Sequence, residues 1–282
     1  MIPMNFMRNK KADYILTGYW AKKAYEEAKL YGKINVAASS EGDNFSYIPD
    51  CRDLDILPDS DYVYMCENNT IYGTKFKTCP DSKGKVLVND VSSCFFSEPM
   101  NVSDYGMVFG GIQKNLGPAG LVIAIIRKDL ITENVLPWTP TMLRYKTHAD
   151  KRSLYNTPPT YNIYIVGEVI KWIQELGGLE KMKEINEKKA YILYDYLDKS
   201  KLFEGLARRD SRSLMNVTFR AKSNEMNAEF IKAAGQNGIV SIGGHRAIGG
   251  MRASLYNAMP IEGVKYLVDF MGDFEEKKLS GY

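Results

Sequence analysis

Short hydrophobic runs alternate with helical patterns through the first half of the chain. Ala21–Leu30 has the periodicity of an amphipathic helix. The hydrophobic runs predict strands at Tyr14–Gly18, Lys33–Ala38, Tyr62–Cys66, Lys85–Asp90, Gly106–Gly110 and Leu121–Ile126. Several of these runs are apolar without alternation, which is typical of strands buried on both faces of a mostly parallel sheet. The pattern therefore predicts an α/β fold.

The second half of the chain has a different pattern. Two long helices are predicted over residues 158–176 and 179–199, separated by the glycine pair Gly177–Gly178. A strand at 214–219, a helix at 227–237, a strand at 251–256 and a helix at 263–277 follow. We therefore expect a large domain over residues 1–175 and a smaller C-terminal α/β domain over residues 176–282.

Composition and charge narrow the class of protein. With 45% hydrophobic and 25% charged residues, the chain has the composition of an ordinary globular protein. Its formal net charge of +3 is too small to indicate a nucleic-acid or membrane partner, and no apolar run is long enough to span a bilayer. The four cysteines, Cys51, Cys66, Cys79 and Cys94, form no C-x-x-C pair. We therefore expect no metal site, and reduced thiols in the cytoplasm.

Lys114 is the first candidate for chemistry. It follows a predicted strand and precedes a Gly-Pro turn, so packed neighbours can desolvate its amine and favour the neutral, nucleophilic form. Such a lysine suits Schiff-base chemistry with pyridoxal phosphate (PLP), which also needs a carboxylate beside the pyridine nitrogen. Asp90 ends the preceding strand and is the candidate for that carboxylate. The simpler alternatives are that Lys114 ends a strand and that Asp90 caps a turn.

Two further residues follow predicted strands. Trp20 lies where a helix opens, so its indole could stack on a cofactor ring or could be an ordinary buried tryptophan. Thr70 lies in a polar turn, where its hydroxyl could bind the cofactor or form the turn itself. Because sites in parallel sheets gather at the carboxyl ends of strands, we expect these side chains to meet in one crevice.

Six motifs occur in an order that is specific to one family. They are GYWA (18–21), ENNTIYG (67–73), VNDVSS (88–93), GGIQKNLGPAG (110–120), YNTPPTY (155–161) and GGHRAIGGMRASLYNA (243–258). Together they make essentially the whole chain resemble the phosphoserine aminotransferases, which are fold-type I, class V PLP-dependent enzymes. The resemblance implies a mostly parallel, seven-stranded type of sheet in the large domain. It also implies transamination between phosphoserine and 2-oxoglutarate in serine biosynthesis, with a related step of vitamin B6 biosynthesis as a further possibility.

The resemblance assigns roles to the cofactor-binding residues. Lys114 matches the lysine that binds PLP covalently and later carries a proton, and Asp90 matches the aspartate that pairs with the pyridine nitrogen. Trp20 matches the tryptophan that stacks on the ring. Thr70 and Gln113 match positions that bind the cofactor near its ring oxygen and phosphate.

The resemblance also assigns residues to the substrate and to a partner subunit. Arg252 matches the residue that binds the α-carboxylate, which its forked donors suit. His245 and Arg246 match residues that meet the substrate phosphate. Asn156 and Thr157 match a pair that reaches the PLP phosphate of the partner subunit, which implies a homodimer with shared sites.

One departure from the family lies at the N-terminal end. Family members carry a segment before the position that matches Met1, and its Gly-rich turn binds the PLP phosphate at a helix N-terminus. We therefore expect a truncated chain that binds PLP weakly and turns over slowly. The alternatives are a related class V transaminase or desulfurase with another amino donor, a non-catalytic dimerising homologue, and a fragment that does not fold alone.

Overall fold

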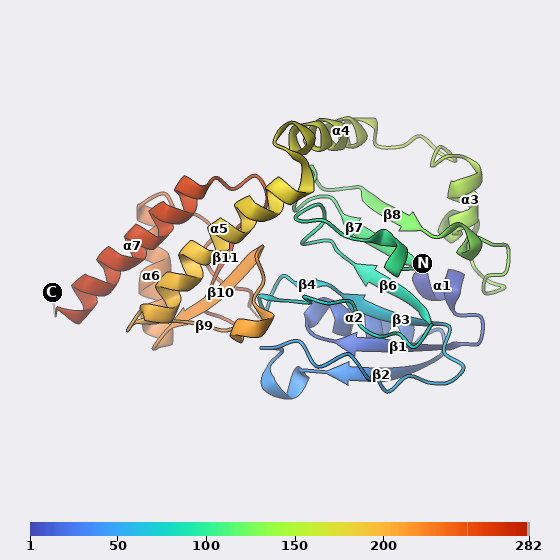
Figure 1. Ribbon diagram of the computed structural model, residues 1–282, viewed down its shortest axis with the longest axis horizontal. Helices are drawn as coiled ribbons and strands as arrows, with labels where there is room; N and C mark the ends of the chain where they lie inside the picture. The colour runs from blue at the N-terminus through green and yellow to red at the C-terminus, as the bar shows by residue number, and fades with distance from the viewer. Residues whose placement is uncertain (247, 281–282) are drawn as a thin grey trace.

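The chain folds into a larger and a smaller body. The computed structural model describes residues 1–246 and 248–280. The larger body lies on the right of Figure 1 and the smaller one on the left, and helix α5 (Gly178–Lys199) runs from one into the other. None of the helices in the described residues is long and apolar enough to cross a membrane.

A mostly parallel sheet forms the centre of the larger body. Six strands of the described residues lie in the order β2-β1-β3-β6-β7-β8, where the family resemblance led us to expect a seven-stranded type. All neighbours are parallel except β7 and β8, which are antiparallel. The strands are β1 (Lys11–Leu16), β2 (Lys33–Ser39), β3 (Tyr62–Cys66), β6 (Val86–Asp90), β7 (Met107–Gly111) and β8 (Val122–Ile126).

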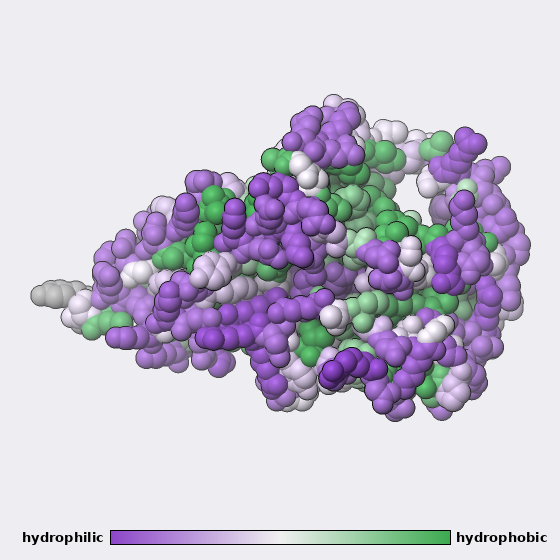
Figure 2. Space-filling view, viewed as in Figure 1, coloured by the Kyte–Doolittle hydropathy of each residue, from purple (hydrophilic) through white to green (hydrophobic). Residues whose placement is uncertain are grey.

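The expectation of burial on both faces is correct for β3 and wrong for β8. Every residue of β3, in the middle of the sheet, is buried. Strand β8 forms the edge of the sheet, and Val122 and Ile125 are 62% and 40% exposed. Hydrophobic residues gather on this face, over β7 and β8 and below α4, in Figure 2. An apolar run indicates a strand but does not say whether another element covers it.

The main helices lie where the sequence predicts them. The predicted helix after the first strand is α2 (Tyr19–Ala28), and the two long helices are α4 (Thr160–Glu175) and α5. The glycine pair at the start of α5 has positive φ angles at both positions, 109° at Gly177 and 79° at Gly178. Two short helices, α1 (Ile2–Phe6) and α3 (Tyr145–Asp150), were not predicted because neither contains a full amphipathic period.

The smaller body pairs an antiparallel sheet with helices. Strands β9 (Phe203–Gly205), β10 (Asn216–Ala221) and β11 (Met251–Ser254) lie in the order β11-β10-β9. Helices α6 (Asn224–Gln236) and α7 (Ile261–Leu279) complete it, together with part of α5. Its core contains four phenylalanines, with the rings of Phe203 and Phe230 4.9 Å apart. The sequence predicted β10, β11 and both helices, and missed the three-residue β9.

A hairpin connects the two bodies. Strands β4 (Asn68–Asn69) and β5 (Thr74–Lys75) pair through a turn that Gly73 closes with a φ of 74°. A Cβ atom at Gly73 would lie 2.7 Å from Oγ1 of Thr218 on β10, so glycine allows the hairpin to approach the smaller body closely. This approach places Thr70 between the two bodies.

Candidate active site

Four candidate residues lie at the carboxyl ends of neighbouring parallel strands. Trp20 follows β1, Thr70 follows β3, Asp90 is the last residue of β6, and Lys114 follows β7. These strands are adjacent in the order β1-β3-β6-β7, so their ends line one edge of the sheet. The parallel topology therefore groups these residues as the sequence predicted, and we refer to this group of strand ends as the crevice.

Lys114 is held inside this crevice. Its Nζ donates a hydrogen bond of 2.9 Å to Oγ1 of Thr70. Burial lowers the pKa of the Lys114 amine below its ordinary value, while the nearby Cys66 and Asp90 oppose that change. The neutral amine, which is the nucleophilic form, is therefore more populated than for a lysine in water.

Asp90 presents a buried carboxylate close to that amine. Its Oδ1 accepts hydrogen bonds from the backbone N–H of Ser92 at 2.9 Å and from its hydroxyl at 2.6 Å. Its Oδ2 accepts a longer one from the Tyr64 hydroxyl at 3.4 Å. Burial raises the pKa of the Asp90 carboxyl, and the Ser92 bonds and the charge of Lys114 work against that rise. Such a carboxylate favours a cationic partner, because a positive charge offsets the cost of its burial.

Arg252 approaches from the smaller body. It lies on β11, and its Nη1 donates to the backbone carbonyl of Thr70 at 3.3 Å. Its Nε is buried and has no hydrogen-bond partner among residues 1–246 and 248–280. A buried donor without a partner is costly, so this guanidinium suits an anionic ligand that would satisfy it.

Trp20 stands at the opening of α2. The helix starts close to the hairpin, because a Cβ atom at Gly18 would lie 2.5 Å from Oδ1 of Asn69. Trp20 is 47% exposed, so it is not an ordinary core tryptophan, and its ring is in edge-to-face contact with Tyr19. This placement brings an aromatic ring to the same strand ends as Thr70.

Three of the remaining candidates lie in segments that adjoin the crevice. The half-buried imidazole of His245 has its ring centroid 5.7 Å from that of Tyr19, the neighbour of Trp20. Arg246, the next residue, is exposed. Gln113 is exposed beside Lys114, and its side chain folds back against Gly111.

Asn156 and Thr157 are not brought into this crevice. Both are exposed in the connection between α3 and α4, and Nδ2 of Asn156 makes a local hydrogen bond to the carbonyl of Thr157 at 3.4 Å. Their assignment to the site of a partner subunit stays a prediction.

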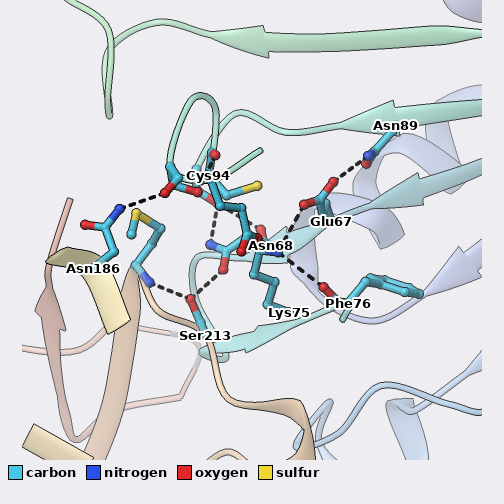
Figure 3. A network of polar contacts seen from close by, with 12 residues as sticks. Glu67, Asn68, Lys75, Phe76, Asn89, Cys94, Asn186 and Ser213 are labelled. Carbon is cyan, nitrogen blue, oxygen red and sulfur yellow. Dashed lines mark hydrogen bonds and ion pairs between the residues drawn. The ribbon is translucent and has the colours of Figure 1, made fainter. Parts of the chain in front are cut away.

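Sequence reasoning missed the polar residues that support the site. Asn68 bonds to Ser93 at 2.7 Å and to Asn216 of β10 at 2.9 Å, and it accepts a hydrogen bond from Ser213 (Figure 3). Ser92 was missed as a partner of Asp90 although D-x-S is a common turn sequence, in which a side chain bonds the backbone two residues on.

A buried ion pair lies beneath the strand ends. Lys75 contacts both Glu67, at 3.1 Å, and Glu98, and Nδ2 of Asn89 donates to Glu67 at 2.6 Å (Figure 3). Burial alone would lower the pKa of Lys75, but the two glutamates hold it above the ordinary value. Asn89 immediately precedes Asp90, so the ion pair supports the strand end that carries the carboxylate.

These residues fit PLP. A desolvated lysine, a buried carboxylate that favours a cation, an exposed indole and a threonine hydroxyl are the chemical groups that a pyridine ring with an aldehyde and a phosphate requires. The unsatisfied Nε of Arg252 adds a donor for a carboxylate at the same place. The crevice therefore has the features of a site for a carbonyl cofactor and an anionic substrate.

The comparisons with known proteins agree with this geometry. The family model described as aminotransferase class-V matches residues 1–267. A phosphoserine aminotransferase of Desulfotalea psychrophila is 52% identical over 97% of this chain and 76% of the relative. A solved phosphoserine aminotransferase of Bacillus circulans superposes with a TM-score of 0.96 at 46% identity, over 98% of this chain and 77% of that one. A PLP-bound phosphoserine aminotransferase from Trichomonas vaginalis has a TM-score of 0.91 at 35% identity, over 96% and 78%.

The fold and the crevice define a fold-type I transferase with a lysine at its centre. The chain belongs to the class-V aminotransferases.

Proposed function

We propose that this chain is a PLP-dependent phosphoserine aminotransferase, which moves the amino group between phosphoserine and 2-oxoglutarate. One observation carries the proposal: the Lys114 amine and the Arg252 guanidinium meet on the same residue, Thr70. The identity of 46–52% to several proteins described as phosphoserine aminotransferases supports the choice of amino donor.

Each side chain then has a task in binding the cofactor. Bound PLP supplies an electron sink for the negative charge that develops at the substrate α-carbon. Lys114 would hold it covalently through Nζ, and Asp90 would pair with the ring nitrogen. Trp20 would stack on the ring, and Thr70 and Gln113 would hydrogen-bond to the cofactor.

Lys114 is also the residue that moves a proton. Its neutral Nζ accepts the proton of the substrate α-carbon, and the lowered pKa makes the neutral form accessible. The Thr70 hydroxyl holds Nζ at 2.9 Å and restricts where the amine can reach. Asp90, which raises the pKa of Lys114, limits how far burial lowers it.

The substrate is bound through its anionic groups. Arg252 orients the α-carboxylate, for which its unsatisfied Nε is available. His245 and Arg246 bind the phosphate, and the place of His245 beside Tyr19 supports a position at the mouth of the crevice. Binding of an anionic side group at this position distinguishes phosphoserine from alanine, whose side chain carries no charge.

A homodimer is part of this proposal. Asn156 and Thr157 are exposed, as residues that serve a partner subunit must be before assembly. The adjacent Leu154 and Tyr155 are 63% and 46% exposed, and exposed apolar patches are typical of interfaces. Analytical ultracentrifugation of the double variant Leu154→Asp/Tyr155→Asp, with wild type as the control, tests whether this surface assembles two copies.

Three finer assignments complete the proposal. The large domain comprises residues 1–175, and the small one comprises residues 176–282. The phenylalanine-rich core supports this division, because all of its residues belong to the second range. The enzyme acts in the cytoplasm. It also takes the phosphorylated threonine-like precursor of vitamin B6, since the same anion sites suit that substrate.

The decisive experiment traps the lysine. After incubation with PLP and borohydride reduction, mass spectrometry of a tryptic digest is expected to find the pyridoxyl modification at Lys114, with Lys114→Arg as the unmodified control. Wild type should then transaminate phosphoserine in preference to alanine. Modification spread over surface lysines, or equal use of both donors, would contradict the proposal.

A further inference from the structure

Lys114 and Arg252 are connected to each other through Thr70. The amine donates to the threonine side chain, and the guanidinium donates to the threonine backbone carbonyl. Each contact is a single hydrogen bond to one turn residue, so the relative placement of the two side chains also depends on the segments that carry them.

A second connection between the same two residues runs through asparagines. Asn115, the residue after Lys114, accepts a hydrogen bond of 3.0 Å at its Oδ1 from the backbone N–H of Asn257. Asn257 lies shortly after the strand that carries Arg252. Lys114, Asn115, Asn257, Arg252 and Thr70 therefore form a closed ring of covalent and hydrogen-bonded links.

The side chain of Asn257 is itself held by two hydrogen bonds. It is 4% exposed, its Nδ2 donates to the carbonyl of Phe96 at 2.9 Å, and its Oδ1 accepts from Nδ2 of Asn186 at 3.0 Å. Nζ of Lys189 binds the two backbone carbonyls that precede Asn257, at 2.9 and 2.8 Å. Asn186 and Lys189 both lie on α5, which also packs into the smaller body.

We propose that Asn257 is a positioning residue for the transamination site, which sets the placement of the Arg252 guanidinium relative to the Lys114 amine. Its side chain contacts Phe96 and Asn186, and it acts through Asn115 and through the segment that follows β11. This inference rests on the proposed function for the roles of Lys114 and Arg252.

The physical reason is the directionality of amide hydrogen bonds. A buried carboxamide with its donor and acceptor both used has one orientation, so the backbone segments that it joins are held in one arrangement. A substrate bound by its carboxylate presents its α-carbon to Lys114 only if that arrangement is kept, and a misplacement of about 1 Å costs on the order of 100-fold in rate. A merely structural asparagine would affect folding without affecting this alignment.

The test compares two buried asparagines of the smaller body. Asn227 is 7% exposed, and its Oδ1 accepts from the backbone N–H of Ala221 at 2.7 Å within that body alone. Asn257→Ala is expected to raise KM for both amino donors about tenfold and to lower kcat, whereas Asn227→Ala, at a similar loss of stability, leaves KM unchanged. If the two variants change KM alike, Asn257 is structural only and the proposal is wrong.

A second measurement needs neither cofactor nor turnover. In PLP-free protein, modification of Lys114 by trinitrobenzenesulfonate, followed by mass spectrometry across pH, reports the environment of its amine. Asn257→Ala is expected to raise the modification rate several-fold over wild type and over Asn227→Ala, because the side chain no longer holds the segment whose backbone N–H bonds to Asn115. Unchanged labelling would overturn the inference, even in a chain that transaminates no phosphoserine.

A double-mutant cycle identifies the route. Asn115→Ala removes the acceptor that Asn257 uses, whereas Asn257→Ala removes the bonds to Phe96 and Asn186. If both act through one link, their effects on Lys114 labelling are less than additive. Fully additive effects would contradict the proposed coupling. Where Asn257→Ala does not fold, Asn115→Ala alone is expected to produce the labelling change, and its failure to do so refutes the proposal.

Discussion

Lys189 makes the stability of the protein depend on pH in an unusual direction. Its side chain is fully buried on α5, and burial lowers the pKa of its ammonium from 10.5 to about 8. The unfolded chain therefore binds the proton more tightly than the folded one. The gap corresponds to about 3 kcal/mol, which opposes folding below pH 8 and disappears as the pH rises towards 10.5.

The sign and the size follow from proton linkage. Between the two pKa values the unfolded state holds more protons, so the free energy of unfolding increases with pH. Integrated from pH 7.5 to pH 9.5, this one residue contributes a gain of about 2 kcal/mol. Above this window the free energy of unfolding falls again as the pH rises. Burial raises the pKa of tyrosines such as Tyr14 in the folded protein, so the unfolded chain ionises them first.

Urea unfolding at several pH values measures this contribution. Lys189→Met is expected to be less stable than wild type at pH 9.5, since carbonyls lose their donor, and to lack about 2 kcal/mol of the pH-dependent gain. Lys199→Met is the matched control, because Lys199 lies on the same helix with a side chain that is 74% exposed. Equal pH slopes in wild type and Lys189→Met would refute the reasoning.

Three further substitutions test the site and its support. Asp90→Asn is expected to lower the pKa of Lys114 further, measured by pH-dependent modification of the amine, and to reduce kcat on the order of 100-fold. Arg252→Lys is expected to raise KM for both amino donors about 10-fold in steady-state assays, because lysine lacks the forked donors. Lys75→Met is expected to lower the free energy of unfolding in urea by about 3–5 kcal/mol, since the buried Glu67 and the partly buried Glu98 lose their partner. An unchanged Lys114 pKa and kcat, an unchanged KM, or an unchanged free energy of unfolding would contradict the corresponding prediction.

The strand pattern was sufficient to predict the centre of the site. Asp90, Thr70 and Lys114 all follow apolar runs, and parallel pairing brings such strand ends to one edge without any knowledge of distant contacts. The contact between Lys114 and Thr70 follows from that topology. Arg252 was identified from a motif, and its approach from another sheet could not be derived from periodicity.

The residues that support the site were beyond this kind of reasoning. Lys189 reads as a surface lysine in a charged helix, but it shares the buried face of Met182, Asn186 and Leu193, and that spacing could have indicated burial. The bond between Asn115 and Asn257 joins segments far apart in the sequence, and a single sequence holds no local signal for such a pair. The exposure of β8 depends on what covers an edge, which a hydrophobic run does not state.

The hydrophobic core beneath the parallel sheet has a consequence for synthesis of the chain. That core contains Met182 of α5 and Met215, both fully buried, alongside residues from the first strands such as Ile15. A ribosome releases the strands of the sheet before it makes the residues that close their core. The apolar surface of the early strands therefore stays exposed until most of the chain has emerged. Chaperones protect such chains during this period.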